Sequence, residues 1–242
     1  MADFTTPTEM IDLPSQGKLY PPNHPLSSGK IEMKYMTAKE EDILSNQTYI
    51  QNGTVIDRLL KSLIVTKLNY DDILIGDKNA IMIAARILGY GPEYKFATVE
   101  GPQTVDLSTL ENKPLHEDVL NADSNNFNFK LPTTDNEITF KFLTHGDEKK
   151  IERELEGLKK INKDASPDVS TRLKHFLTSI NGDSDPPTIR KFVDQAFLAR
   201  DSRALREYVN QIQPDVDLTF FPQDRKYSKS IPIGIGFFWP DV

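Results

Sequence analysis

The chain has 242 residues, of which 38% are hydrophobic and 27% are charged, so it can fold around a sizeable core as one large domain or two small ones. Its formal net charge of −7 at pH 7 argues against a general binder of nucleic acid or of anionic membranes. The absence of cysteine excludes disulfides, thiolate catalysis and zinc sites built from cysteine.

Residues 1–30 form a segment with five prolines, which favour extended or turn geometry over a helix. The sparse apolar side chains of this segment are available as anchors: Leu13, Leu19, Tyr20 and Leu26. The sequence favours an arm that docks onto its own domain or onto a neighbouring protein. A flexible tail is the alternative.

A strand and a capped helix are expected after the arm. The stretch KIEMKYM, residues 30–36, alternates apolar and charged side chains with the period of a half-buried strand. Thr37 and Glu40 have the spacing of a capping box, in which the first residue caps a free amide and the second reaches back. This signal predicts a short helix that runs to about Gln47.

Two further helices are expected in the N-terminal half. The first should begin at Thr54, because apolar residues then recur along one helical face from Val55 to Ile64. The second should begin at Asp77 and stop at Gly89 and the following Gly91-Pro92 pair. Its sequence is apolar nearly all round, so we expect it to be the most buried helix of this half.

The composition changes after Tyr90. From Tyr94 to about Phe142 the sequence predicts strands in YKFATV, QTVDLS, FNFKL and EITFKFL, with turns at Gly101-Pro102 and at 132–136. These strands should form a small antiparallel sheet that contains a long polar loop, NADSNN.

Helices should return at Asp147, where the first one has a narrow apolar stripe among many charges. The pair Ser166-Pro167 is typical of a second helix start, and the apolar face of that helix should extend through Leu177 and Ile180 to Gly182. Two more helices should follow, broken near Asp201-Ser202. The tail is expected to return to β structure in VDLTFF and IPIGIGFFWP.

The predicted fold class is therefore α+β, with two helical lobes, a small antiparallel β-ribbon associated with each, and an extended N-terminal arm. The expected segments are the arm (1–30), an N-terminal strand and helical lobe (31–92), a small antiparallel β region (93–145), a C-terminal helical lobe (146–213) and a C-terminal β-ribbon (214–242).

A search for catalytic chemistry finds no G-x-S-x-G elbow, phosphate-binding loop or H-E-x-x-H motif. The four histidines lie in different segments without metal-ligand spacing: His24, His116, His145 and His175. Paired carboxylates such as Asp71-Asp72 are explained as caps and first-turn charges of helices. We therefore expect no catalytic residue, no metal ligand and no cofactor, and the chain is not predicted to be an enzyme.

Two features point instead to an interaction protein. The only tryptophan and two phenylalanines lie within the last six residues, where they are either packed in the core or presented to a partner. The proline-rich arm is the second feature. The candidate partner-binding residues are Leu13, Pro14, Leu19, Tyr20, Pro21, Phe237, Phe238 and Trp239.

The location of the protein follows from what its sequence lacks. Its first residues carry neither a basic nor an apolar segment, so they do not resemble a secretory signal. The most apolar run, Ala80–Leu88, is about half of the roughly 18 residues that a membrane-spanning helix needs. We expect a soluble protein made in the cytoplasm, without membrane contact.

Five stretches of the sequence together resemble the baseplate hub proteins of T4-like contractile-tailed bacteriophages. In chain order these are LPS-x-G-x-x-YPP…PL-x-SG, MTAKEEDIL, NGTVIDRLLKSLI, YVNQIQPDVDLTF and IPIGIGFFWP. The resemblance covers most of the chain and is weakest across roughly 112–190. It implies a tail-morphogenesis protein without enzymatic activity, located in the host cytoplasm during assembly and then in the baseplate of the tail. Its partners would be other baseplate or tail proteins, and self-association stays open.

The resemblance leaves two versions of this function open, a subunit kept in the virion and an assembly chaperone that leaves. It also implies that the arm docks on other subunits, so that trimming residues 1–28 should leave folding intact but abolish baseplate assembly. Some relatives carry C-x-x-C pairs in the two β-ribbons, where this chain has Val99 to Pro102 and Phe221 to Asp224, so a metal role is not carried over. Apolar packing of Tyr94, Phe96, Phe220, Phe221 and Ile231 is expected to close both ribbons instead.

A different class of function is the alternative. A nucleic-acid-binding module could use the β-ribbons and a basic set on the last helices, although Asp194, Asp201 and Glu207 are interleaved with it. The basic set is Arg190, Lys191, Arg200, Arg203 and Arg206. A hydrolase with scattered carboxylates is a third and weaker hypothesis.

Overall fold

The computed structural model describes residues 5–98, 101–162, 167–221 and 229–239. This part of the chain combines helices with small antiparallel sheets, which confirms the predicted α+β class. The first third contains β1 (Thr8–Asp12), η1 (Pro25–Ser28), β2 (Lys30–Lys34), α1 (Ala38–Leu44), α2 (Gln47–Gln51), α3 (Val55–Leu63), η2 (Tyr70–Asp72) and α4 (Ile75–Tyr90). The middle contains β3 (Glu93–Thr98), β4 (Gly101–Asp106), η3 (Leu107–Thr109), α5 (Glu117–Leu120), β5 (Phe127–Lys130) and β6 (Glu137–Phe140). The last part contains α6 (His145–Ile161), α7 (Asp168–Phe176), β7 (Leu177–Ile180), α8 (Pro186–Gln195), α9 (Ala199–Ile212), β8 (Thr219–Phe220), β9 (Lys229–Ser230) and η4 (Ile235–Phe238).

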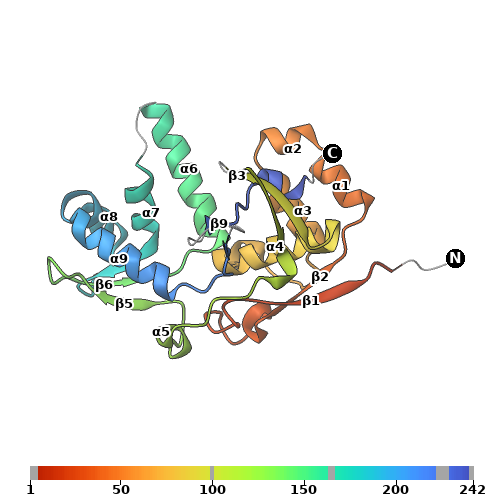
Figure 1. Ribbon diagram of the computed structural model, residues 1–242. Coiled ribbons are helices and arrows are strands. Elements are labelled where there is room, and N and C mark those ends of the chain that lie inside the picture. Colours follow the sequence, from red (N-terminus) through yellow and green to blue (C-terminus); the bar gives the residue numbers. More distant parts are fainter. Residues whose placement is uncertain (1–4, 99–100, 163–166, 222–228, 240–242) are drawn as a thin grey trace.

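Helix α4 runs through the middle of the molecule (Figure 1). The N-terminal helices α1–α3 and the β1–β2 ribbon lie on one side of α4, and α7–α9 with β5 and β6 lie on the other. The buried side chains of both sides form one continuous hydrophobic core. The chain therefore folds around α4 as a shared centre.

The burial of α4 agrees with its sequence, which is apolar nearly all round. Ile81 and Ala85 are fully buried, and Ala80, Ala84 and Leu88 are nearly so. The helix begins at Ile75, two residues before the expected start. No helix within the described ranges is both long and apolar enough to cross a membrane.

The N-terminal arm is part of this fold. Strand β1 pairs antiparallel with β2 over five residues, from Thr8 opposite Lys34 to Asp12 opposite Lys30. The residues between them turn back through Gly17 and Gly29, which both adopt positive φ and each approach the backbone of the other side of the turn. The expected extended arm is therefore corrected to a folded hairpin.

The sheet predicted between 94 and 142 divides into two. Strands β3 and β4 form a separate hairpin, whereas β5, β6 and β7 form a three-stranded antiparallel sheet. Strand β7 lies in a segment predicted as helix, which was wrong from Leu177 onward. The reason is tertiary, because β6 offers a free edge on which Ile180 pairs with Ile138.

Other element boundaries in the structure also differ from the predicted ones. The first helix ends at Leu44, because Asn46 accepts a hydrogen bond from the Tyr49 amide (3.1 Å) and starts α2 as a new helix. The last two helices are broken at residues 196–198 instead of at Asp201-Ser202. In the tail, residues 235–238 form the 3₁₀ turn η4 and not a strand.

Candidate functional site

The structure places the candidate partner-binding residues of the arm in the core. Leu13 is 1% exposed and Leu19 is 4% exposed, and Pro14 and Tyr20 are also buried, so only Pro21 of this group faces solvent. Of the alternatives weighed for the arm, the structure therefore shows docking onto its own domain. Trimming residues 1–28 would remove part of the core, so the expectation that such a protein still folds has to be abandoned.

Asp77 holds the arm against α4. Its side chain is 1% exposed and accepts three hydrogen bonds from the arm. The Ser15 amide donates to Oδ1 (2.9 Å), and the hydroxyls of Ser15 (2.7 Å) and Tyr20 (2.8 Å) donate to Oδ2. Burial raises the pKa of Asp77, while the three donors act in the opposite sense. The carboxylate has no cationic partner among the described residues, so these neutral donors alone compensate for its burial.

The C-terminal aromatics are also largely internal. Phe237 is 1% exposed, Phe238 is fully buried, and Trp239 is half-buried. The Phe237 ring meets the ring of Tyr94 edge-on, with centroids 4.7 Å apart. These contacts fix the end of the described chain on the β3–β4 hairpin, so two of the three side chains are not accessible to a partner in this conformation.

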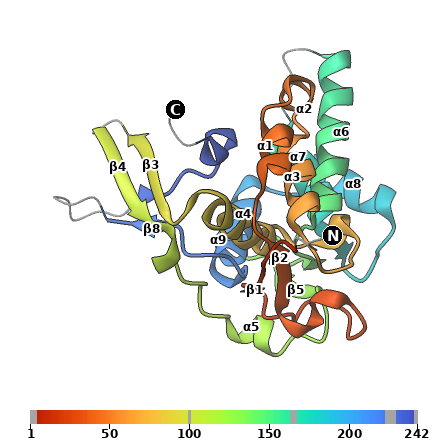
Figure 2. The same cartoon turned by 90° about the vertical axis from the view of Figure 1, so that its right-hand side faces the viewer.

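The two β-ribbons lie together, with β8 beside the β3–β4 hairpin (Figure 2). Phe96 packs edge-on against Phe220 with centroids 5.2 Å apart, and Tyr94 stacks on Phe96. Ile231 is 2% exposed. The expected apolar closure of the ribbons is thus confirmed for four side chains, but it is wrong for Phe221, which is 70% exposed.

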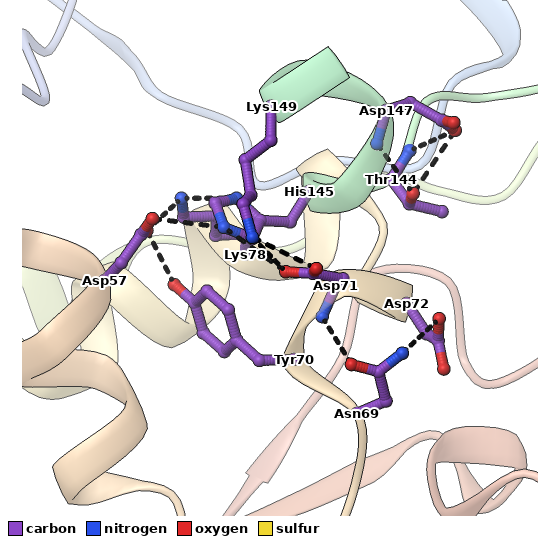
Figure 3. A network of polar contacts seen from close by, with 10 residues as sticks. All are labelled: Asp57, Asn69, Tyr70, Asp71, Asp72, Lys78, Thr144, His145, Asp147 and Lys149. Carbon is purple, nitrogen blue, oxygen red and sulfur yellow. Dashed lines mark hydrogen bonds and ion pairs between the residues drawn. The ribbon is translucent and has the colours of Figure 1, made fainter. Parts of the chain in front are cut away.

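The constellation that most resembles a catalytic site is a polar cluster of six residues, Asp57, Tyr70, Asp71, Lys78, His145 and Lys149 (Figure 3). Lys78 Nζ lies 2.9 Å from Asp57 Oδ1 and 3.1 Å from His145 Nδ1. His145 Nε2 lies 3.1 Å from Asp57 Oδ2, within ion-pair distance but without hydrogen-bond geometry. The cluster therefore joins α3 and α4 to the first residue of α6.

Electrostatics favour the ionised carboxylates in this polar cluster. Burial alone would raise the pKa of Asp57, but the contacts of His145 and Lys78 outweigh it and hold that pKa well below its usual range. Hydrogen bonding from Lys149 (3.0 Å) lowers the pKa of Asp71. Tyr70 donates its hydroxyl to Asp57 (3.2 Å), and burial next to that charge raises the tyrosine pKa.

This polar cluster has the residue types of proton-transfer chemistry but not the setting. An imidazole beside a carboxylate and an amine can act as a general acid or base when it faces a reacting group. Here the side chains are engaged with one another, and the hollows beside β1, along β5 and β6, and between α7 and α9 are lined by other residues. The arrangement explains how the two halves of the fold are joined. It was missed in the sequence because Asp57 and His145 are far apart in the chain.

In the described ranges, no group of three or more histidine or acidic side chains is placed to hold a metal ion. His175 lies 2.9 Å from Glu154. His116 and His24 each accept a hydrogen bond from a backbone amide two residues later, at Asp118 and Leu26. These histidines have local structural partners.

The basic set on α8 and α9 is partly neutralised. Arg190 forms a two-pronged ion pair with Glu154 (2.7 and 3.0 Å), which together with His175 lowers the pKa of Glu154 to about 2. Arg203 pairs with Glu207 at 2.8 Å. Glu154 of α6 and the interleaved Glu207 therefore take up part of the positive charge that would bind a phosphate backbone.

Glu40 is the acidic residue of the capping box at the start of α1. Its carboxylate is fully buried and accepts hydrogen bonds from Lys34 (2.8 Å), Ser62 (2.7 Å) and the amide and hydroxyl of Thr37 (3.0 and 2.6 Å), which confirms the predicted capping box. Burial would raise the pKa of Glu40, but these donors outweigh it and lower the pKa to about 2.

Replacing Glu40 with glutamine should therefore lower the free energy of unfolding by about 2 kcal/mol at neutral pH. Because the folded-state pKa is depressed, the stabilisation by Glu40 is present above pH 4.5, the ordinary value, and is lost as the pH falls towards 2. Urea unfolding at several pH values should show the two proteins converging in acid. A difference that stays constant with pH would contradict this account.

A hollow of about 340 Å³ lies beside strand β1 and is the candidate interaction site. Its floor is one face of α4, formed by Ala80, Ile83, Ala84, Ile87 and Leu88. One wall contains Glu9, Ile11 and Asp12, and the other contains Leu107, Ser108, Leu110, Asn112 and Val216. We call this hollow the β1 groove. No local sequence pattern indicates this groove, because its walls come from segments about a hundred residues apart.

Comparison of the chain with protein-family models, with curated proteins and with solved structures finds no match. The family resemblance therefore depends on the five sequence stretches alone.

Proposed function

We propose that this protein is a structural or assembly component of a bacteriophage baseplate hub that acts through protein–protein contacts and not through catalysis. The observation that supports the proposal is the convergence of the five resembling stretches on α4 and its neighbours. The resemblance would be weaker evidence if the five stretches lay apart in the structure. Instead, all five contribute to one hydrophobic core.

The contacts of these stretches are direct. The arm reaches α4 through the hydrogen bonds of Ser15 to Asp77. The MTAKEEDIL stretch forms α1, which packs on α3, and α3 in turn packs on α4. The YVNQIQPDVDLTF stretch approaches α4 so closely at Pro214 that only a glycine fits at position 76. The terminal stretch packs Phe237 on Tyr94, just beyond the end of α4.

The other two hypotheses gain nothing from this geometry. Nucleic-acid binding would require free cations, and Arg190 and Arg203 are paired with carboxylates. A hydrolase would require acidic groups that face a reacting molecule, and Asp57, Asp77 and Glu40 are each engaged by donors of the chain itself.

Particles of the source phage provide the test. We expect deletion of the gene to block baseplate assembly, and mass spectrometry of purified tails to decide between the two versions of the function. A fixed ratio of this chain to a known baseplate subunit would identify a virion component, and its absence together with blocked assembly would identify a chaperone. Normal tails from the deletion phage would contradict the proposal.

A further inference from the structure

The β1 groove lies next to a free sheet edge. Strand β1 pairs with β2 on one side only, and the outer edge of β2 is occupied because Ile64 forms a bridge with Met33 and the Val65 amide donates to Glu32. Ile11 and Ile31 are cross-strand partners, yet Ile31 is fully buried whereas Ile11 is half-buried and lines the groove. The groove therefore opens on the unpaired side of β1.

The register shows which backbone groups face that side. Pro7 accepts from the Tyr35 amide, and Leu13 donates to Gly29, so odd-numbered residues of β1 form the hydrogen-bonded pairs with β2. The N–H and C=O groups of Thr8, Met10 and Asp12 consequently point to the free edge. They have no backbone partner within the part of the chain that the structure describes. An exposed edge of this kind is a template for another strand.

The floor and charge of the groove define what would fit. Ala80, Ile83, Ala84 and Ile87 have the i, i+3, i+4, i+7 spacing of a single helical face, so they present a continuous apolar surface beside the strand edge. The lining contains two carboxylates, Glu9 and Asp12, and no lysine or arginine. Asp12 is already paired with Lys30 (2.8 Å), whereas Glu9 has no cationic partner among the described residues. The whole chain carries a net charge of −7.

We propose that the β1 groove binds an extended segment of a partner protein, which adds to β1 as a third, antiparallel or parallel strand. Main-chain hydrogen bonds to Thr8, Met10 and Asp12 supply affinity, and alternate apolar side chains of the segment lie on α4. Lysine or arginine on the segment complements Glu9. The inference deepens the proposed function, because it states how a baseplate partner would be held.

Proline at position 10 provides a specific test. It removes the outward N–H of Met10, while the ladder to β2 uses the odd-numbered residues, and proline is tolerated on the edge of a sheet. The matched control is Met10→Ala, which shortens the same exposed side chain but keeps the N–H. The probe is a capped peptide of about eight alternating valine and lysine residues, within the usual length of a strand.

We expect the Val-Lys peptide to bind the full chain in calorimetry, and to slow hydrogen exchange at the amides of Thr8, Met10 and Asp12. Met10→Pro should weaken binding roughly tenfold, the effect of one lost hydrogen bond, and Met10→Ala should change it little. A Val-Glu peptide should bind more weakly than the Val-Lys peptide. N-methylation of alternate amides of the Val-Lys peptide should abolish binding, which tests strand addition even if Met10→Pro is unstable.

Three outcomes would overturn the inference. These are the absence of binding, binding that is equal for the N-methylated peptide, and concentration-dependent self-association through β1, which would make a second copy the occupant. The test is separate from that of the proposed function. If this chain is found in purified tails but binds no strand peptide, the strand-addition inference fails and the baseplate proposal stands.

Discussion

Replacing Gly76 with alanine is expected to lower the free energy of unfolding by about 3–4 kcal/mol, a large effect for a single methyl group. Gly76 is buried in the first turn of α4, opposite the segment that follows α9. A Cβ atom there would lie 1.9 Å from the carbonyl oxygen of Pro214 and 3.0 Å from its carbonyl carbon. Both obstacles are backbone atoms, so no side-chain rotation can relieve the clash.

The surroundings of Gly76 give little room for adjustment. Pro214 is buried, and the next residue, Asp215, accepts a hydrogen bond from Asn79 on the same helix (2.9 Å). Alanine at position 76 would therefore push this segment away from α4 and open the core. At roughly 2–4 °C per kcal/mol for a protein of this size, the melting temperature should fall by about 6–16 °C.

Gly157→Ala is the matched control for this experiment. Gly157 is also in a helix, α6, but it is exposed and no atom lies within 4 Å of the position that a Cβ would take. Since alanine is the better helix former, this variant should gain about 0.5–1 kcal/mol. Thermal and urea unfolding would measure both variants. Equal stability of Gly76→Ala and the parent protein would show that α4 does not contact the segment after α9 in this way.

Elements with a strong local signal could be predicted from the sequence. Helix α3 was recognised by its apolar face, on which Val55, Leu59, Leu60 and Leu63 are buried, and α1 by its capping box. The α+β class followed from alternating runs of such signals. These predictions succeeded because the energetics that decide them are contained within one or two turns of chain.

The predictions that failed depend on partners distant in sequence. The local sequence of β7 predicts the end of a helix. The segment is a strand because it pairs with the edge of β6. The stretch GIGFFW is rich in aromatics like a strand, but burial of Phe237 against Tyr94 favours a tight turn. The polar cluster around His145 and the β1 groove each combine segments that no local pattern connects. The β1 groove is the one of these features on which the proposed strand addition depends.

Replacing Asp77 with asparagine should lower the free energy of unfolding by about 3 kcal/mol, although the two side chains have nearly the same shape. All three groups that meet this carboxylate donate hydrogen bonds to it. The amide NH₂ of asparagine would have to face either the Ser15 amide or the two hydroxyls, so a donor would oppose a donor. The Tyr20 hydroxyl already accepts from the Leu74 amide (3.0 Å), which directs its own proton towards Asp77.

Two effects compete in this variant, and their sizes decide the result. Asparagine removes a buried charge, whose desolvation raises the pKa of Asp77, and this relief would be stabilising. Against it stand the one or two hydrogen bonds that the NH₂ group would displace, each contributing about 1.5–3 kcal/mol to a charged acceptor, and the cost of donors left unpaired. The losses exceed the relief, so the arm should separate from α4 more readily.

Hydrogen exchange would locate this effect, because the amides between Leu13 and Tyr20 should lose protection before those of α6. Asp106→Asn is the control. Asp106 also accepts from an amide and a hydroxyl, both of Ser108 (2.9 and 2.6 Å), but it is exposed, so water can replace those bonds and the loss should be below about 1 kcal/mol. If both variants lost the same stability, the arm would not depend on Asp77. A selective loss for Asp77→Asn would show that a buried carboxylate joins the proline-rich arm to the central helix, and thereby holds β1 and its free edge in place.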